Sequence, residues 1–198
     1  MTTRGAIFTG GKGTHKREEN DFYATPKDTV TCFFDSYKIN PKTILEPAAG
    51  QGHISKVLEE LFPNAEIEST DLIDRGYGLG GVNFLEKDYK DKKYDLVITN
   101  PPFKYAKEFV EKALSISNDK VIMLLKIQFL EGISRKEFLE NSPLKYVYVF
   151  SNRQSTMRNG EPINPKTGKK WSSTFLLAWF VWEVGYEGEP KIRWLITK

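Results

Sequence analysis

Short apolar runs alternate with amphipathic stretches along most of this chain. Five runs have the composition of buried or half-buried strands, at residues 43–46, 65–70, 82–85, 94–99 and 121–125. Other stretches space their apolar side chains at helical intervals and predict helices, at residues 29–37, 54–61, 105–116 and 135–140. Strands that alternate with helices are joined by right-handed crossovers. The pattern therefore predicts an α/β fold with a mostly parallel sheet.

The last part of the chain changes character. Three further strand-like runs, at residues 145–150, 176–184 and 191–196, have no helical pattern between them. Parallel pairing needs a long crossover, so we expect antiparallel strands at the C-terminal end of the sheet. Both alternating faces of residues 176–182 are apolar, which is typical of a strand covered on both sides. Trp179 and Trp182 are therefore expected in the core and not in a base-stacking surface.

The length of 198 residues suits one domain, which we assign to residues 21–198. Residues 1–20 are polar, glycine-rich and without periodicity, and we expect them to form a flexible basic arm. No apolar run is long enough to span a membrane, so we expect no membrane partner. Because the first residues also lack the apolar middle of a signal peptide, a cytoplasmic location is expected.

One cysteine and two histidines leave little for metal or thiol chemistry. An internal disulfide is excluded, and no group of residues has the spacing of metal ligands, so we expect no metal. Cys32 falls in an apolar-rich helical stretch and is expected to be a small buried side chain. His53 precedes a helix, where it either approaches a ligand or stays solvated.

The net charge of +3 and the pI near 8.8 lean only mildly toward anionic partners. The distribution of charge is more informative. Residues 151–174 form a long loop that carries one acid, Glu161, and five bases: Arg153, Arg158, Lys166, Lys169 and Lys170. Basic loops often serve solubility alone, but this loop is also the candidate nucleic-acid-binding segment.

The strongest chemical signal is the sequence Asn100, Pro101, Pro102 and Phe103 at the end of the predicted strand 94–99. Two prolines fix the backbone and donate no N–H, so the Pro101 carbonyl and the Asn100 amide are held stiffly. Two oxygen acceptors beside an aromatic face suit a planar substrate that carries an NH2 group. The alternative is a strand-ending turn whose phenylalanine packs in the core.

A second motif follows the predicted strand 43–46. Residues 46–52 form a glycine turn before a helix, where a ligand can approach the backbone closely. The third glycine of the dinucleotide fingerprint is missing, since Ser55 and Lys56 stand where it would be. A pyrophosphate is therefore not indicated, and a smaller zwitterionic ligand fits the turn better.

Acidic residues follow the next two predicted strands. Asp71 stands where an acid binds the ribose hydroxyls in nucleoside-binding sheets. Asp88 is the candidate acceptor for an adenine amino group, with Leu72 and Phe84 as candidate apolar walls. Either acid alone would be explained as a strand-ending cap. Together with the glycine turn and the Asn100 motif, they place signals at four successive strand ends.

These motifs, in this order, resemble the S-adenosylmethionine-dependent amino-methyltransferases, most closely the small phage and bacterial DNA adenine-N6 enzymes. The resemblance runs from residue 21 to about residue 194. It implies a Rossmann-like methyltransferase fold, S-adenosylmethionine as cofactor, DNA as partner, and the host cytoplasm as location if the protein is phage-encoded. It assigns methyl transfer to Asn100, Pro101, Pro102 and Phe103. It assigns cofactor binding to Tyr23, Thr25, Pro26, Glu46, Pro47, Ala48, Gly50, Gly52, Asp71, Leu72, Asp88 and Asn100.

The chain departs from the large restriction-associated enzymes because too few residues follow residue 125 for a separate recognition domain. Only the loop 151–174 is long enough to contact a target. An RNA adenine-N6 methyltransferase and a protein glutamine methyltransferase would use the same pocket, and a catalytically silent binding module would keep the same fold. The sequence leaves open whether the protein is a monomer or a homodimer.

Overall fold

The computed structural model describes residues 23–152, 154, 157–158, 161, 163, 167–169 and 176–197. The predicted arm 1–20 lies outside these residues. In chain order, the elements are β1 (Tyr23–Ala24), α1 (Lys27–Ser36), β2 (Thr43–Glu46), α2 (Ser55–Leu61), β3 (Glu66–Ser69), β4 (Tyr94–Thr99), η1 (Phe103–Tyr105), α3 (Ala106–Ser115), β5 (Ser117–Lys126), η2 (Ile127–Leu130), α4 (Ile133–Asn141), β6 (Leu144–Phe150), β7 (Met157–Arg158), β8 (Leu177–Glu183) and β9 (Lys191–Leu195).

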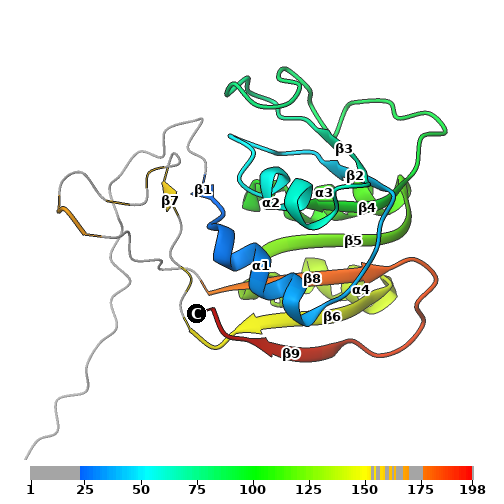
Figure 1. The fold of residues 1–198 in the computed structure, drawn as a ribbon. Coiled ribbons are helices and arrows are strands. Elements are labelled where there is room, and N and C mark those ends of the chain that lie inside the picture. Colours follow the sequence, from blue (N-terminus) through cyan, green and yellow to red (C-terminus); the bar gives the residue numbers. More distant parts are fainter. Residues whose placement is uncertain are drawn as a thin grey trace, which may run out of the picture.

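Seven strands form the central sheet, in the order β3-β2-β4-β5-β8-β6-β9 (Figure 1). The first four run parallel, and β8 runs antiparallel to both of its neighbours. This confirms the predicted α/β fold with antiparallel pairing at the C-terminal end. The last strand differs from the prediction, since β9 pairs parallel with β6. A short connection turns the chain back after β8, and β6 lies between the two strands, so β9 runs the same way as β6.

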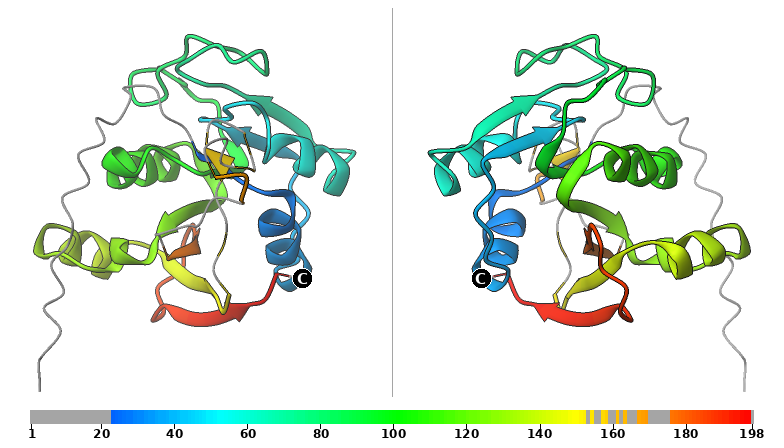
Figure 2. Two further views of the ribbon diagram at one scale, coloured as in Figure 1. Left: turned by 90° about the vertical axis from the view of Figure 1, so that its left-hand side faces the viewer. Right: turned by 90° about the vertical axis from the view of Figure 1, so that its right-hand side faces the viewer.

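Helices cover both faces of the sheet (Figure 2). On one face, α3 packs Phe109, Val110 and Ala113 into a core that includes Trp182. On the other face, α1 and α2 enclose a core that includes Trp179. Both tryptophans are fully buried, as the two apolar faces of β8 predict. Cys32 on α1 is only partly buried, and its thiol donates to the Thr29 carbonyl.

The strand predicted at residues 82–85 is absent, because this segment forms a turn. The Asn83 carbonyl accepts from the amides of Glu86 and Lys87, and the Asn83 side chain accepts from the amide of Leu85. Local hydrogen bonds to an asparagine thus replace pairing with a neighbouring strand. Phe84 is still buried, with its ring centroid 4.9 Å from that of Phe109. The apolar pattern therefore belongs to a partly buried turn that places one aromatic side chain in the core.

Among the described residues, no helix is both long and apolar enough to cross a membrane. The same residues contain no cluster of three or more histidine, cysteine or acidic side chains placed to hold a metal ion.

Candidate active site

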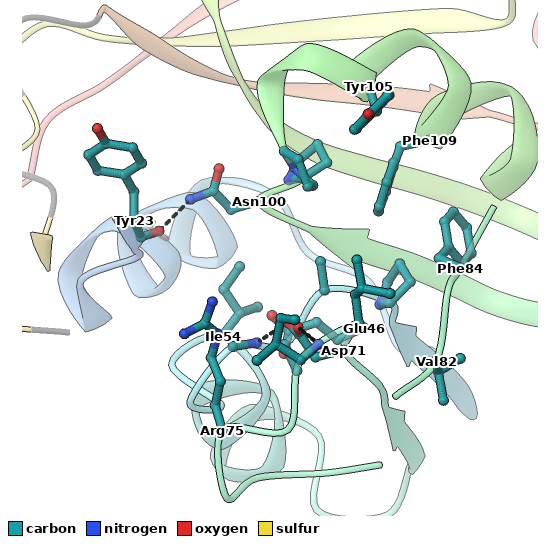
Figure 3. Close-up of a pocket in the computed structure, with 18 of the residues that line it drawn as sticks. Tyr23, Glu46, Ile54, Asp71, Arg75, Val82, Phe84, Asn100, Tyr105 and Phe109 are labelled. Atoms are coloured by element: carbon teal, nitrogen blue, oxygen red, sulfur yellow. Dashed lines mark hydrogen bonds between the residues drawn. The ribbon is translucent and has the colours of Figure 1, made fainter. Parts of the chain in front are cut away.

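A cavity of about 630 Å³ opens at the C-terminal ends of β2, β3 and β4 (Figure 3). In an open α/β sheet this edge is where ligands bind. Most of the residues predicted from the sequence line it: Tyr23, Thr25, Glu46, Pro47, Ala48, Gly50, Asp71, Leu72, Asn100, Pro101, Pro102 and Phe103. Three of the predicted cofactor residues do not line it: Pro26, Gly52 and Asp88. The fold therefore brings the two main motifs of the sequence into one cavity.

Asn100 follows β4 directly, and its side chain is held at one end. The amide nitrogen Nδ2 donates to the main-chain carbonyl of Tyr23 over 2.9 Å and to the Thr25 hydroxyl oxygen over 3.2 Å. Figure 3 shows the Asn100 side chain reaching toward the Tyr23 carbonyl. Because both hydrogens of Nδ2 have acceptors, the amide is fixed in one orientation.

The other end of the Asn100 amide is the unusual one. Its oxygen Oδ1 is buried, and it has no hydrogen-bond partner among the described residues. A buried acceptor without a donor costs about 1–3 kcal/mol, so native proteins rarely leave one. An acceptor of this kind in the lining of a cavity is suited to a ligand that brings its own N–H.

The prolines after Asn100 end the strand and shape the wall beside it. Pro101 is buried, and the Pro102 carbonyl accepts from the Tyr105 amide, which starts the short helix η1. Phe103 begins that helix and is partly buried at the cavity. Tyr105 and Phe109 extend this aromatic wall along the next turns, although the sequence motif did not include them. Their signal in the sequence is their spacing of two and six residues after Phe103.

The glycine turn after β2 is held by Asp71. One carboxylate oxygen of Asp71 accepts from the Gly50 amide and the other from the Ile73 amide, both over 2.8 Å. Gly50 has a φ of 58°, which favours glycine and keeps the backbone open toward the cavity. Asp71 therefore fixes the loop as well as lining the cavity.

Gly52, which was predicted to bind the cofactor, is not part of the cavity lining and packs against Tyr77 behind the turn. Its φ is 78°, and a Cβ at this position would lie 2.5 Å from the Tyr77 ring. Only glycine allows the ring to pack this closely.

Glu46 ends β2 as a fully buried carboxyl group in the cavity lining. It accepts a short hydrogen bond from the Ser55 hydroxyl, which lies 2.6 Å from the Ser69 hydroxyl. Burial raises the pKa of Glu46 to about 8, and the Ser55 hydrogen bond opposes part of that shift. A carboxyl group with this pKa is mostly protonated at neutral pH.

Asp88 lies outside the cavity. It is exposed, and one of its carboxylate oxygens accepts from the Lys90 amide in a tight turn. Asn83 and Glu86 occupy the cavity lining in its place, together with Phe84. The sequence predicted a strand at residues 82–85, so the site residue was expected after residue 85. For this reason Asn83 was not identified as a lining residue. Leu72, the other predicted apolar wall, is a rim residue with 59% of its surface exposed.

Three further basic side chains line the cavity, those of His53, Arg75 and Lys104. Partial burial lowers the pKa of His53, and the nearby Lys56 ammonium lowers it further. His53 is therefore neutral at physiological pH.

The predicted basic loop is described only in part. Arg153, Lys166 and Lys170 lie outside the described residues, and Lys169 is exposed. Arg158 belongs to β7, which pairs antiparallel with β1, so that Arg158 lies opposite Tyr23. The loop is thereby joined to the segment that holds Asn100.

No protein-family model matches the chain, and no curated protein matches its sequence. Solved structures do resemble it. The "modification subunit of a putative type I restriction enzyme" from Vibrio vulnificus aligns over 88% of this chain, with a TM-score of 0.59 and 15% identity. This chain spans about half of that protein, 47% of its length.

Two other solved structures are similar over most of their own length. The "putative RNA methyltransferase" from Pyrococcus horikoshii has a TM-score of 0.54 and 16% identity, covering 78% of this chain and 81% of that one. The precorrin-6y C5,15-methyltransferase from Geobacter metallireducens has a TM-score of 0.54 and 13% identity, covering 81% and 92%. At these identities the likeness establishes the fold. The chain has the Rossmann-like α/β fold of methyltransferases.

Proposed function

We propose that this protein transfers a methyl group from S-adenosylmethionine to the exocyclic N6 of adenine in DNA. The observation that carries the proposal is the buried Asn100 Oδ1, an acceptor without a partner among the described residues, in an amide whose nitrogen is already bonded twice. An NH2 group on a planar ring supplies the missing donor.

The residues of the cavity fit S-adenosylmethionine. The open backbone at Gly50 and the Asp71 carboxylate suit its ribose and amino-acid portions, and Phe84 offers an apolar wall for its adenine. The bound cofactor supplies a methyl group made electrophilic by a sulfonium. Two solved structures of the same fold that carry methyltransferase names support this cofactor.

For the acceptor base, the protein has to position the amino nitrogen that receives the methyl group. The lone pair of an exocyclic amino nitrogen is delocalised into its ring, which makes the nitrogen a poor nucleophile. Asn100 Oδ1 and the Pro101 carbonyl accept its two hydrogens, favour a pyramidal nitrogen and aim its lone pair at the methyl group. A nitrogen–carbon bond would form as the carbon–sulfur bond of the sulfonium breaks, S-adenosylhomocysteine would leave as a neutral thioether, and the methylated nitrogen would lose one hydrogen as a proton to water. Phe103 stacks on the ring. This is orientation and electrostatic preorganisation, and it requires no covalent intermediate.

An adenine in a duplex reaches this cavity only after it leaves the base stack, which costs a few kcal/mol. The basic loop 151–174 is suited to contact the phosphates beside the extruded base. Its two described residues in β7 join it to the cavity through Tyr23. The basic residues of the loop 151–174 favour a nucleic acid over a protein amide as the methyl acceptor.

The test is methyl transfer from labelled S-adenosylmethionine to DNA, RNA and protein in parallel, followed by mass spectrometry of nucleosides and amino acids. We expect N6-methyladenine in DNA. Methyladenine from RNA alone, or methylglutamine from protein, would overturn the assigned substrate. Cofactor binding without transfer to any of the three would indicate a silent module.

The Asn100→Ala variant tests the acceptor. It should bind the cofactor with nearly parental affinity in calorimetry while losing methyl transfer. Asn141→Ala is the matched control, because Asn141 is exposed on α4 and should not affect turnover. A rate for Asn100→Ala above about a tenth of the parent, a change of only about 1.4 kcal/mol in the barrier, would contradict the role.

A further inference from the structure

A second, smaller cavity lies beside the first. Its volume is about 170 Å³, and Phe103 lines both cavities. The rest of its lining comes from α3, from the end of β5 and the following turn η2, and from Arg135 on α4. None of the sequence motifs pointed to this cavity. It adjoins the ring that we assign to the acceptor base.

Arg135 builds the polar side of this cavity. Its Nε donates to the Phe129 carbonyl over 2.9 Å, and its Nη2 donates to the carbonyls of Gln128 and Glu131. The turn can close over the guanidinium because Gly132 has a φ of 115°, and a Cβ there would lie 3.0 Å from the Arg135 side chain. The guanidinium thus fixes η2, and its Nη1 is outside these three bonds.

These bonds also decide which ligand the cavity suits. Arg135 donates to three main-chain carbonyls of the turn, which reduces their capacity to accept hydrogen bonds from a ligand. The lining side chains of Lys126, Gln128 and Arg135 all carry N–H donors, and the Gln128 amide oxygen is the one side-chain acceptor among these three. A nucleobase edge needs acceptors as well as donors, whereas a phosphate oxygen needs donors only. The chemistry of the lining therefore favours an anion.

Lys126 supplies positive charge at the junction of the two cavities. It is the last residue of β5, it is partly buried, and its ammonium lies 4.7 Å from the centroid of the Phe103 ring. Apolar walls from Ala106, Leu125 and Phe129 limit the screening of this charge by water. The ammonium is thus placed next to the ring on which the acceptor base would stack.

We infer that the second cavity binds a phosphodiester group of the acceptor strand, next to the nucleotide whose base enters the main cavity. Lys126 contacts the phosphate, with Gln128 and Arg135 as further donors. This inference rests on the proposed function and deepens it, because it makes the acceptor a polynucleotide and defines where its backbone runs.

The experiment measures binding of a fluorescent single-stranded oligonucleotide containing adenine, by anisotropy, over a range of salt concentrations. Lys126→Gln should weaken binding roughly tenfold, as expected for the loss of one charge-assisted hydrogen bond. It should also reduce the slope of log affinity against log salt by about 0.7, the value for one phosphate contact on a single strand. Lys126→Arg should retain most of the affinity.

Lys136→Gln is the matched control. Lys136 is an exposed lysine on α4 that pairs with Glu140, so the variant has the same change in net charge away from the cavity. We expect it to bind like the parent. Equal losses for Lys126→Gln and Lys136→Gln would show an effect of net charge only and would overturn the inference.

Kinetics separate a phosphate contact from a supporting role under Phe103. With oligonucleotide as acceptor, Lys126→Gln should raise KM with little change in kcat, whereas transfer to free deoxyadenosine should be nearly unaffected. Equal losses of kcat with both acceptors and an unchanged salt slope would indicate support of the ring alone, and would contradict the inference.

The outcomes also separate this inference from the proposed function. Oligonucleotide binding that depends on Lys126, without methyl transfer, would overturn the proposed activity and leave the phosphate site standing. Methyl transfer to adenine with a binding constant and salt slope unaffected by Lys126→Gln would support the proposed activity and overturn the phosphate site. A parent protein that binds no oligonucleotide at any salt concentration would refute the phosphate site.

Discussion

The side-chain nitrogen of Asn100 donates a hydrogen bond to the main-chain carbonyl of Tyr23, and the two atoms lie 2.9 Å apart. Tyr23 belongs to β1, whose partner strand β7 is part of the loop 151–174. The orientation of the proposed acceptor residue thus depends on a segment that pairs with the basic loop. The pairing of β1 with β7 thereby links this loop to the position of Asn100.

The second bond to Asn100 leads to the first prediction, Thr25→Val. The Thr25 hydroxyl is buried and accepts from Asn100 Nδ2, so valine removes one of the two bonds that orient the amide and keeps a similar shape. We expect kcat to fall about fivefold, for the loss of about 1 kcal/mol. Thr25→Ser keeps the hydroxyl and serves as the control in steady-state kinetics. Parental kcat in the valine variant would refute this positioning role.

The strands nearest the site were predictable from sequence because their boundaries carry local signals. The apolar run of β4 is stopped by the sequence Asn100, Pro101, Pro102, and β2 ends at Glu46, before a turn that requires glycine. Side chains on both faces of β4 are buried, so the apolar run in the sequence and the observed strand agree. The direction of β9 was not predictable in this way, because it depends on β6 lying between β8 and β9.

Site residues that directly follow an observed strand were predictable from the sequence, and those in turns were not. Asp71 and Asn100 follow β3 and β4, and both reach the cavity. The apolar run predicted a strand at residues 82–85 and Asp88 as the site residue after it, whereas the segment forms a turn and places Asn83 and Glu86 in the lining. The second cavity was not apparent because Arg135 acts on main-chain carbonyls, which leave no signal in the sequence.

A second prediction concerns Asp71→Asn. Both carboxylate oxygens accept from backbone amides, and an asparagine would turn an N–H group toward one of these donors. We expect cofactor affinity in calorimetry to fall at least tenfold. The variant would lose one of the two hydrogen bonds that Asp71 accepts from the backbone amides of Gly50 and Ile73, and the ligand would lose a charged acceptor. Asp74→Asn is the control, because Asp74 is exposed and accepts from Gly76 within its own loop. Parental affinity in Asp71→Asn would contradict the assignment.

A third prediction separates backbone strain from steric contact at Gly52. Gly52→Ala combines an unfavourable positive φ with a Cβ 2.5 Å from the Tyr77 ring, whereas Gly185→Ala has a similar φ of 83° and open space. We expect Gly185→Ala to lower the free energy of unfolding by about 1 kcal/mol and Gly52→Ala to lower it by about 2–4 kcal/mol. Chemical denaturation measures both. Removing the ring in the double variant Gly52→Ala, Tyr77→Ala should recover part of the added loss, and similar losses in the two single variants would argue against the steric contact.

The buried carboxyl of Glu46 makes stability depend on pH. Burial raises its pKa from 4.5 to about 8, so the folded protein binds this proton more tightly than the unfolded chain does. The stabilisation is fully present below about pH 4.5 and is lost as the pH rises through about 8, by up to about 1.4 kcal/mol per pH unit within this window.

Glu46→Gln has no proton to lose and keeps an oxygen that can accept from Ser55. Chemical denaturation between about pH 5 and pH 9 should therefore show a stability that falls in the parent and stays flatter in the variant. Glu60→Gln, at an exposed position on α2, should keep the parental slope. Parallel curves for the parent and Glu46→Gln would show that Glu46 is already ionised in the folded protein.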